Sequence, residues 1–583
     1  MRFGIFYEHQ LPRPWLPGAE RALFEQTLEQ VEVADRVGID YVWEVEHHFL
    51  EEYSHSSAPE VFLAAVSQRT KRIRLGHGIV QIPPGYNHPA RVAERVATLD
   101  LISGGRVDFG TGEGSSAAEL GGFGVDRSEK RAMWTDALDA ITRMFVETPF
   151  AGWDSRFLTM PPRNVVPKPL QKPHPPLWMA CSRRETIQAA AKAGVGALSF
   201  SFIEPEAAAA WVDEYYQTLT SDACVPAGFC VNPNVTVVVP MMCHHDEATA
   251  IERGIDGAHF FGYSLAHYYG AAQHAPGRTD VWAEFLERRD EVGFARHVVR
   301  AEDAPLGIKV LQHGIGSLRG AIGTPAQIHD LLCRYQAAGV DQVVFVMQTG
   351  RSQHEHICES LEIFGREVLP RFVDGRDQAE ADKAARLAPA IERALARRAP
   401  AREAAPYVIN EAAELERARQ SDGPRSLSEL VGSARAEVAR EVRARVRERL
   451  ARLVRGRSER EIERRFGAGW VQRLIFAAMA RSFNPAKAFG FEGDIVYELA
   501  RQPGGAEVVD RWTLHVGDGR AVAQAGDATA PALRMRLEVV DFARMMVGEI
   551  APSEPIMQGR MHIEGDLSLA LRAGEMFGGR SSY

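Results

Sequence analysis

The chain has 583 residues, of which 45% are hydrophobic and 25% are charged, and its formal net charge is −9 at pH 7. A single hydrophobic core stops growing well below this length, so we expect at least two domains. The negative net charge argues against a general nucleic-acid-binding protein.

Strand-like and helix-like segments then alternate through the first part of the chain. The predicted strands are Arg2–Phe6, Tyr41–Val45, Ile73–Ile82, Val107–Gly110, Leu177–Ala180, Leu198–Phe202, Val235–Pro240 and Gln342–Met347. The predicted helices are Arg21–Val37, Pro59–Gln68, Arg91–Ile102, Ser128–Phe145, Glu185–Ala193, Glu206–Thr220, Glu247–Ala258 and His354–Val368. Eight such alternations favour a closed (β/α)8 TIM barrel, whose active site lies at the carboxyl ends of its strands.

Ionisable side chains gather at the end of the second predicted strand. The stretch Val42–Tyr53 begins as a buried strand and then carries Glu46, His47 and His48. Such groups are costly at a strand end unless they line a site or meet water, so a solvated strand exit with one packed histidine stays open. Because successive strand residues point to opposite sides, we expect only one of the two rings to face the barrel mouth. Neighbouring loops offer no complete ligand set, so we expect no metal site.

A glycine-rich loop, Gly110–Ser115, follows the fourth predicted strand. Its glycine spacing differs from G-x-G-x-x-G, and a nicotinamide-binding turn would follow the first strand, which argues against a Rossmann site. We interpret these glycines as places where the backbone approaches a flat ring or a phosphate. The segment Ala180–Ser182, which leads into a helix, offers N–H groups for an anion.

Short motifs in a fixed order give residues 1 to about 371 a family resemblance. They are M-R-F-G-I-F at Met1–Phe6, E-H-H-F at Glu46–Phe49, L-G-H-G-I-V at Leu75–Val80, N-H-P-A-R-V-A-E at Asn87–Glu94, L-D-L-I-S-G-G-R-V-D-F-G-T-G at Leu99–Gly112 and G-T-P at Gly323–Pro325. This part resembles the bacterial luciferase-like, flavin-dependent monooxygenases, whose fold is the eight-stranded barrel.

The resemblance implies roles for individual residues. His47 matches the histidine that acts as an acid or base near the flavin, which suits an imidazole with a pKa near neutrality. The junction between His77 and Gly78 matches a bulge with a non-proline cis peptide against the flavin ring. The implied cofactor-binding residues are Glu46, His77, Gly78, Gly112, Ser182, Arg183 and Thr186. Glu113 stands where luciferase has an arginine on the flavin phosphate, so Arg183, Arg184 or backbone donors would supply the positive field.

The implied reaction uses reduced FMN and O2 to put one oxygen atom into an apolar organic substrate. A separate flavin reductase would supply the reduced FMN, because no nicotinamide fingerprint is present. The candidates for a substrate-pocket wall are Phe200, Phe202, Phe260, Phe261, Tyr263, Tyr268 and Tyr269, although such residues are more often plain core. A deazaflavin (F420)-dependent oxidoreductase on the same barrel stays open.

Composition divides the rest of the chain. After a barrel domain over residues 1–374, residues 375–479 are rich in alanine, arginine and glutamate and predict a charged helical connector. One long amphipathic helix is predicted there from Leu427, Leu430, Ala434, Val438, Val442, Val446, Leu450 and Leu453. Packing on its own protein, a dimer contact and a membrane-surface role stay open for this helix. We expect a homo-oligomer, with a dimer as its simplest form.

Residues 480–583 predict a small α+β domain. Its predicted elements are strands at Gly493–Leu499, Arg511–Val516, Ala521–Ala525 and Leu533–Val539 and helices at Asp541–Gly548 and Leu567–Phe577. The motifs G-D-I-V-Y-E-L at Gly493–Leu499 and I-M-Q-G-R-M-H-I-E-G-D at Ile556–Asp566 resemble the sterol-carrier-protein-2 (SCP2) domain, which implies an apolar tunnel for lipids. The candidate lipid-pocket residues are Phe542, Met545, Met546 and Leu571, for which a closed core is equally consistent. A lipid carrier with a catalytically silent barrel is the remaining alternative.

Cysteines and apolar runs bear on location. The six cysteines are scattered, with no C-x-x-C pair, as in proteins whose thiols stay reduced inside the cell. Residues 1–30 lack the pattern of a signal peptide, and no apolar run is long enough to span a bilayer. We therefore predict a cytoplasmic protein with no integral membrane segment.

Overall fold

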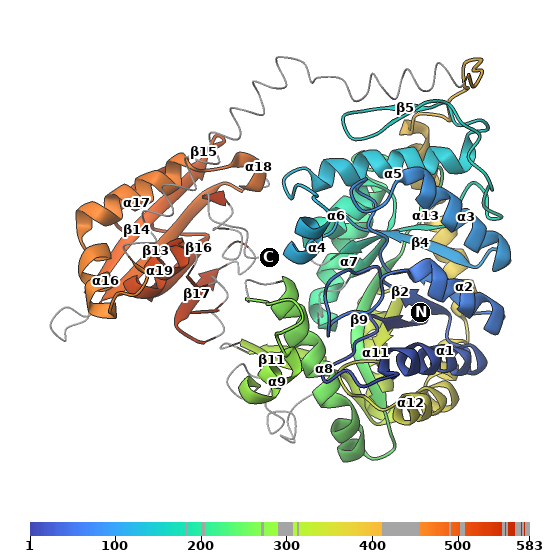
Figure 1. Ribbon diagram of the computed structural model, residues 1–583, viewed down its shortest axis with the longest axis horizontal. Helices are drawn as coiled ribbons and strands as arrows, with labels where there is room; N and C mark the ends of the chain where they lie inside the picture. The colour runs from blue at the N-terminus through green and yellow to red at the C-terminus, as the bar shows by residue number, and fades with distance from the viewer. Residues whose placement is uncertain are drawn as a thin grey trace. The chain divides into compact units, whose positions relative to one another are not determined.

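The computed structural model describes residues 1–181, 184–199, 204–269, 273–289, 307–311, 314–410, 454–488, 491–501, 508–547, 549–550, 554–555, 558–565, 569, 573 and 576–577. The chain divides into two compact units, and the main part of the first extends from Met1 through Tyr407 (Figure 1). No helix in the described ranges is both long and apolar enough to cross a membrane.

Eight parallel strands close the barrel of the first unit. In order around the barrel they are β1 (Arg2–Tyr7), β2 (Tyr41–Glu44), β3 (Arg74–His77), β4 (Val107–Thr111), β7 (Leu177–Cys181), β8 (Gly196–Ser199), β9 (Val235–Cys243) and β12 (Gln342–Val346). Closure comes from β12, which pairs with both β9 and β1, with Gln342 opposite Arg2. The TIM barrel predicted from the alternation is therefore confirmed.

Helices cover the outside of the barrel (Figure 1). They are α1 (Ala19–Val37), α2 (Pro59–Arg69), α3 (Pro89–Ile102), α5 (Lys130–Val146), α6 (Arg184–Lys192), α7 (Pro205–Thr220), α11 (Pro325–Ala337) and α12 (His354–Glu367). The helix predicted at Glu247–Ala258 continues as α8 (Glu247–Tyr269), because the residues that follow stay apolar. Three elements between α8 and α11 were not predicted: α9 (Val281–Arg288), β10 (Gly307–Leu311) and β11 (Gly314–Gly323).

Two tryptophans fill the interior of the barrel. Trp43 on β2 and Trp178 on β7 meet edge to face, with ring centroids 5.2 Å apart. Glycines on neighbouring strands make room for them: a Cβ on Gly76 would lie 2.1 Å from the Trp43 ring, and one on Gly196 would lie 2.3 Å from the Trp178 ring. The Trp178 indole N–H donates to Asp108 at 2.9 Å. The barrel is thus a packed core, and the strand ends are left for chemistry.

The first unit continues past the predicted barrel boundary at residue 374. Helix α13 (Arg376–Arg397) holds to the barrel through ion pairs at the amino ends of strands. Glu380 pairs with Arg2 at 2.7 Å, and Lys383 pairs with Asp341 at 2.6 Å. The beginning of the segment expected as a connector therefore packs on the barrel. The predicted amphipathic helix from Leu427 to Leu453 lies outside the described residues.

The second unit is built on a five-stranded sheet with the order β15 (Arg520–Ala525), β14 (Val508–Gly517), β13 (Gly493–Arg501), β16 (Leu533–Glu538) and β17 (Met561–Gly565). Strand β17 was not predicted from the sequence. Alternation along the strands puts Ile495, Leu514 and Leu533 in the apolar core. The other face carries ion pairs such as Glu498 with Arg534 at 2.8 Å.

Helices cover the apolar face of this sheet. They are α16 (Glu459–Phe466), α17 (Gly469–Arg481), α18 (Pro485–Ala488) and α19 (Val539–Val547). Phe476 on α17 stacks on Trp512 and Phe542, with ring centroids 4.9 and 5.5 Å away. The tail core thus begins with helices that precede residue 480, inside the stretch expected as a connector.

Candidate active site

His47 lies just past β2, between two carboxylates. Its Nδ1 is 3.0 Å from Oε1 of Glu119 on the short helix α4 (Ala117–Gly122), and its Nε2 is 3.7 Å from Oε2 of Glu8, which follows β1. The His47 side chain is 9% exposed, and those of Glu8 and Glu119 are 3% and 0% exposed. A histidine held between two acids and shielded from water is suited to taking up and releasing a proton.

Burial and the facing charges shift the pKa values of this cluster. Burial alone would lower the pKa of His47, but the carboxylates of Glu8 and Glu119 outweigh it and raise that pKa to about 9. Burial raises the pKa of Glu8 to about 7, against the opposing effects of His47 and the Tyr53 hydroxyl. Two neighbouring groups therefore change their protonation state in or near the neutral range.

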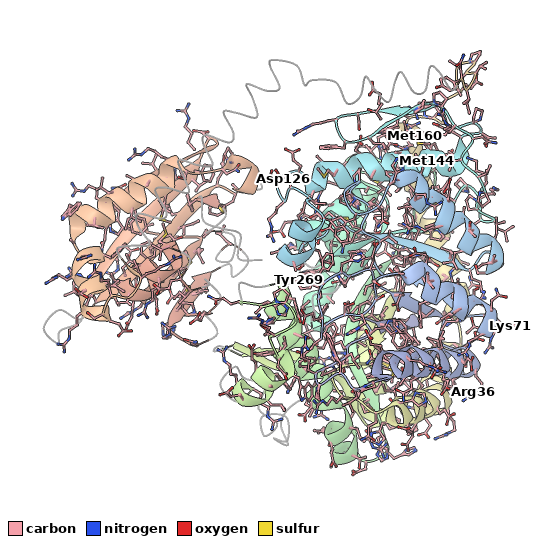
Figure 2. All side chains as sticks on the ribbon, in the orientation of Figure 1. Arg36, Lys71, Asp126, Met144, Met160 and Tyr269 are labelled. Carbon is pink, nitrogen blue, oxygen red and sulfur yellow. The ribbon has the colours of Figure 1, made fainter. Side chains whose placement is uncertain are left out.

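Two tyrosines complete the cluster. Tyr269, which is labelled in Figure 2 at the end of α8, has its hydroxyl 3.2 Å from both ring nitrogens of His47. Tyr53 donates to Glu8 at 2.9 Å. Burial raises the pKa of each tyrosine well above its ordinary value. Both hydroxyls therefore keep their protons through the neutral range.

His48 points to a different side from His47. Its Nε2 is 3.1 Å from Oε1 of Glu46, and its ring meets that of Phe123 edge-on, with centroids 4.9 Å apart. Glu46 also accepts hydrogen bonds from the backbone N–H of Gln81 and from the amide of Asn87, both at 2.8 Å. Glu46 therefore ties the end of β2 to the segment after β3.

A β-bulge interrupts the edge of the barrel after His77. The register pairs His77 with Phe109 and then Gln81 with Gly112, so the β3 side has one residue more than the β4 side. The cis peptide implied by the resemblance is absent, because the cis bonds in the described chain all precede prolines. The centroid of the His77 ring lies 6.2 Å from that of Phe109, a core residue between the sheet and the helices. Burial lowers the pKa of His77 to about 4. The backbone of Gly78, rather than the His77 side chain, stays at the strand end.

Gly110 and Gly112 allow close contact between strands. A Cβ on Gly110 would lie 2.0 Å from the carbonyl oxygen of His77, and a Cβ on Gly112 would lie 2.1 Å from the Ile79 side chain. The sequence suggested a ring or phosphate as the reason for these glycines. In the structure the bulged strand occupies that space, which accounts for both glycines without a ligand.

The carboxylate of Glu113 is neutralised by helix α5. Lys130 Nζ lies 3.1 Å from one of its oxygens, and Arg131 Nε lies 2.6 Å from the other. Burial raises the pKa of the Cys181 thiol, and the Arg131 guanidinium opposes part of this rise, which places its charge near the end of β7. Positive charge at this side of the mouth therefore comes from α5, which the sequence did not indicate.

The predicted phosphate-binding turn is described only in part. Thr186, in the first turn of α6, hydrogen-bonds the Cys181 thiol at the end of β7. The other two predicted residues, Ser182 and Arg183, lie outside the described residues.

The predicted substrate-pocket residues are likewise described only in part. Tyr263 lies against Phe285 of α9, with ring centroids 5.6 Å apart, instead of beside His47. Tyr269 does contact His47, as described above. Phe200 and Phe202 lie outside the described residues.

In the tail, Phe542 belongs to the packed aromatic core, whereas Met545 and Met546 are half-buried at its margin. The fourth predicted lipid-pocket residue, Leu571, lies outside the described residues.

Several buried polar atoms at the barrel mouth make no hydrogen bond to the part of the chain that the structure describes. They are Glu8 Oε2, Glu119 Oε2, Gln81 Oε1 and Tyr86 Oη. A Cβ on Gly114 would lie 2.7 Å from the Tyr86 hydroxyl and 2.8 Å from Gln81 Oε1, so both atoms border the same position beside Gly114. A buried polar atom without a partner costs about 1–3 kcal/mol, so such a cluster indicates a polar ligand.

The orphaned atoms fit a flavin ring. Its polar edge presents N–H donors and carbonyl acceptors, which match the carboxylate and amide oxygens and the tyrosine hydroxyl found here. By contrast, the described residues include no group of His, Cys, Asp and Glu arranged to hold a metal ion. The buried oxygens without hydrogen-bond partners among the described residues suit an organic cofactor with a polar edge.

Glu8 and Glu119 are functional candidates that the sequence reasoning missed. Glu8 directly follows the first strand, so the rule that barrel sites lie at carboxyl strand ends could have found it. Glu119 lies on a six-residue helix that Ser116 caps by accepting the Ala118 N–H. A helix this short carries no apolar periodicity, so nothing in the sequence marks its inward face.

This barrel is a fold typical of enzymes. The buried cluster of Glu8, His47 and Glu119 at its mouth is typical of an enzyme active site. Residues 1–342 match the Luciferase-like monooxygenase family, and residues 484–578 match the SCP-2 sterol transfer family. The first match covers more than half of the chain. The chain belongs to the Luciferase-like monooxygenase family.

Individual relatives agree with this assignment. The oxygenase component of flavin-dependent trigonelline monooxygenase from Acinetobacter baylyi is 25% identical over 387 residues, which are 64% of this chain and 97% of that protein. Limonene 1,2-monooxygenase from Rhodococcus erythropolis is 40% identical over 144 residues, which are 24% of this chain and 35% of that protein. This chain spans only 37% to 49% of the length of three other curated relatives. Monooxygenase RslO1 from Streptomyces bottropensis shares the fold, with 24% identity, a TM-score of 0.50 and coverage of 64% of this chain and 100% of that chain.

Proposed function

We propose that this protein is a flavin-dependent monooxygenase that uses reduced FMN and O2 to oxygenate an apolar organic substrate. The observation that carries the proposal is the buried His47 between Glu8 and Glu119. Beside it, polar atoms of Glu119, Gln81 and Tyr86 have no hydrogen-bond partner among the described residues. Similarity to flavin-dependent trigonelline monooxygenase along most of that protein supports the choice of a flavin. A separate reductase supplies the reduced flavin, as the description of that relative as an oxygenase component suggests.

Residues at the barrel mouth have two roles: some orient the cofactor and one moves a proton. Reduced FMN, when bound, supplies the electrons that activate O2. Glu119, Gln81 and Tyr86 orient the polar edge of the ring. Because Nδ1 of His47 is engaged by Glu119, the proton that moves is the one at Nε2, which faces Glu8.

Aromatic rings beside the cluster favour an apolar substrate. The centroid of the Tyr53 ring lies 5.7 Å from that of Phe261, 6.2 Å from that of Tyr268 and 5.9 Å from that of Tyr269. These rings exclude water from the reacting atoms. On this proposal the SCP2-like tail binds the apolar substrate and presents it to the barrel.

The cofactor is tested first. The purified protein should bind FMN, identified by its absorption spectrum and mass, and should consume O2 when given chemically reduced FMN and an apolar substrate. Binding of deazaflavin F420 with hydride transfer and no O2 consumption would instead indicate the alternative oxidoreductase. Lipid binding with neither cofactor would indicate a carrier whose barrel is silent.

His47 is tested by substitution. His47→Ala should lower oxygenation by about 10²- to 10⁴-fold, the usual contribution of a general acid or base, while FMN affinity stays nearly unchanged. His48→Gln, which keeps a hydrogen-bonding group beside Glu46, is the matched control and should retain most activity. Unchanged turnover in His47→Ala would contradict the assignment.

A further inference from the structure

A second buried pair of a histidine and a carboxylate lies beside the candidate active site, and the proposed chemistry does not use it. His9 follows Glu8 just after β1, and Glu44 is the last residue of β2. Nδ1 of His9 lies 2.8 Å from Oε1 of Glu44, and the two side chains are 0% and 1% exposed. Such a pair adds little net stability, because both groups lose their water, so its position indicates another role.

The ring of His9 is held at both of its nitrogens. Nε2 lies 3.1 Å from the hydroxyl of Thr27 on α1. That hydroxyl donates its own proton to the carbonyl oxygen of Leu23 at 2.8 Å, so Nε2 carries a hydrogen and donates it to Thr27. On the other side, Nδ1 and Glu44 share one proton. The Phe24 ring packs against the imidazole with its centroid 4.6 Å away, so the ring is fixed in one position.

The backbone of His9 has a conformation that side chains rarely adopt. Its φ is 55°, in the left-handed region, where the Cβ is crowded. Before this turn, Glu8 faces Nε2 of His47 at 3.7 Å. After it, the N–H of Gln10 donates to the side chain of Gln348 at 2.9 Å. A strained turn persists only where its surroundings hold it, and here the anchored ring does so.

Glu44 also connects the pair to the backbone of His47. The hydroxyl of Ser56 hydrogen-bonds the Glu44 carboxylate, and the carbonyl oxygen of Ser56 accepts the N–H of His47 at 2.8 Å. The regular pairing of β1 with β2 ends at Glu44. Beyond that point, His9 and Glu44 tie together the two strand exits that carry Glu8 and His47.

We propose that His9, anchored by Glu44, is a positioning residue that holds the left-handed turn and so keeps Glu8 opposite Nε2 of His47. This inference deepens the proposed function and rests on it only for the effect on turnover. Without the anchor the turn relaxes to a negative φ, and the Glu8 carboxylate moves away from the ring. The attraction that favours protonated His47 then weakens, so its pKa falls.

A direct effect of charge has the opposite sign. Loss of a cationic His9 would favour the protonated form of His47 and raise its pKa. The direction of the change therefore separates positioning from simple electrostatics. In the described chain, the other titratable groups that face His47 are Glu119 on α4, Glu46 on its own segment, Tyr53, and Tyr269 at the end of α8.

NMR titration of the His47 ring in the cofactor-free, full-length protein tests the inference. In His9→Ala, His47 should titrate about one pH unit lower than in the original protein. His9→Asn also removes the ring, but asparagine tolerates the left-handed region, so most of the original value should return. The matched control is His174→Ala. His174 is a buried histidine before β7 that accepts the N–H of Phe229 at 2.8 Å, and its loss should leave His47 unchanged.

A double variant shows whether His9 acts through Glu8. In the Glu8→Gln background, His9→Ala should lower the titration of His47 no further. The inference is overturned by a fall of the same size in that background, or by an unchanged His47 in His9→Ala. An equal fall in His9→Asn or in His174→Ala would likewise overturn it. If His9→Ala does not fold, Thr27→Val, which removes the partner of Nε2, should shift His47 in the same direction, and no shift there would overturn the inference.

Turnover gives a second readout. With reduced FMN and an apolar substrate, the limb of the pH profile of kcat/KM that belongs to His47 should move to lower pH in His9→Ala. The limb should stay in place in His174→Ala. Absence of oxygenation in the original protein would contradict the proposed function alone, because the NMR titration requires neither cofactor nor turnover.

Discussion

Glu8 is one of the two carboxylates that raise the pKa of His47. The two carboxylates that face His47 raise its pKa to about 9 despite burial, so removing one of them leaves burial less opposed. In Glu8→Gln the pKa of His47 should therefore fall. The limb of the pH profile of kcat/KM that belongs to His47 should move to lower pH, whether the ring acts as acid or base. Titration of the His47 ring by NMR gives the same shift directly.

The control for this prediction is Glu60→Gln. Glu60 lies on α2 and pairs with Arg95 at 2.7 Å, away from His47. Its removal should leave the limb in place. A limb that stays at its original pH in Glu8→Gln would show that another group titrates there.

The same cluster predicts how barrel stability depends on pH. The pKa of folded His47, about 9, lies above its unfolded value of 6.5, so its stabilising effect is complete below pH 6.5 and is lost as pH rises toward 9. Burial raises the pKa of Glu8 from 4.5 to about 7, so Glu8 also makes the folded barrel less stable as pH rises from 4.5 to 7. The Tm should therefore fall as pH rises from 6.5 to 9, and His47→Gln should flatten the fall. A Tm in the variant that follows the original slope would argue against this linkage.

At the residue scale, the sequence identified His47 but not the carboxylates that contact it in the structure. The E-H-H-F motif was enough to place His47 at a strand end near Glu46. Its partners could not be predicted, because Glu8 comes from another strand and Glu119 from a helix without periodicity. Only the register of the closed barrel brings these three side chains together.

At the scale of elements, Gly76 is the critical residue of β3. A Cβ there would lie 2.1 Å from the Trp43 ring, which is itself held by Trp178. Gly76→Ala should therefore destabilise the barrel by about 1–3 kcal/mol or more, measured by urea unfolding. Gly121→Ala on α4 is the control, because nothing lies within 4 Å of its added methyl group. It should leave stability unchanged or raise it by up to about 1 kcal/mol.

Strand and helix periodicity predicted the barrel elements well, because each strand is buried on both faces and each helix has one apolar side. The prediction failed between α8 and β12. There α8 stays apolar well past the length of an ordinary barrel helix, and α11 begins at a capping box formed by Thr324 and Gln327 that was read only as a family motif. Strand β17 was missed because it is short and mostly exposed at an edge, and its sequence M-H-I-E-G was read only as part of a family motif.

For the whole molecule, the structure shows where the two units should be separated. A deletion of residues 480–583 would leave α16 and most of α17 attached, with Phe476 and Met479 stripped of the sheet that buries them. A cut at residue 374 would remove α13 and the arginine Arg402, which pairs with Glu147 at 3.2 Å. A chain ending at Asn410 keeps α13 and Arg402 with the contacts that they make to the barrel.

This barrel fragment, residues 1–410, should fold and keep activity toward short-chain substrates. Activity toward long-chain substrates should fall relative to the full chain if, as proposed, the tail presents them. Steady-state kcat/KM for a series of chain lengths measures the effect, and circular dichroism checks the fold. Equal loss for all lengths, or no loss, would contradict a presenting role for the tail.

The pairing of β1 with β12 also has a consequence for synthesis on the ribosome. The first strand finds its closing partner, Gln342–Val346, only after some 340 further residues have been made. At about 5–20 residues per second, β1 waits on the order of tens of seconds with one edge open. During that time its apolar edge is a site for mispairing with other nascent chains. We therefore expect the yield of active protein to depend on chaperones that cover this edge during synthesis.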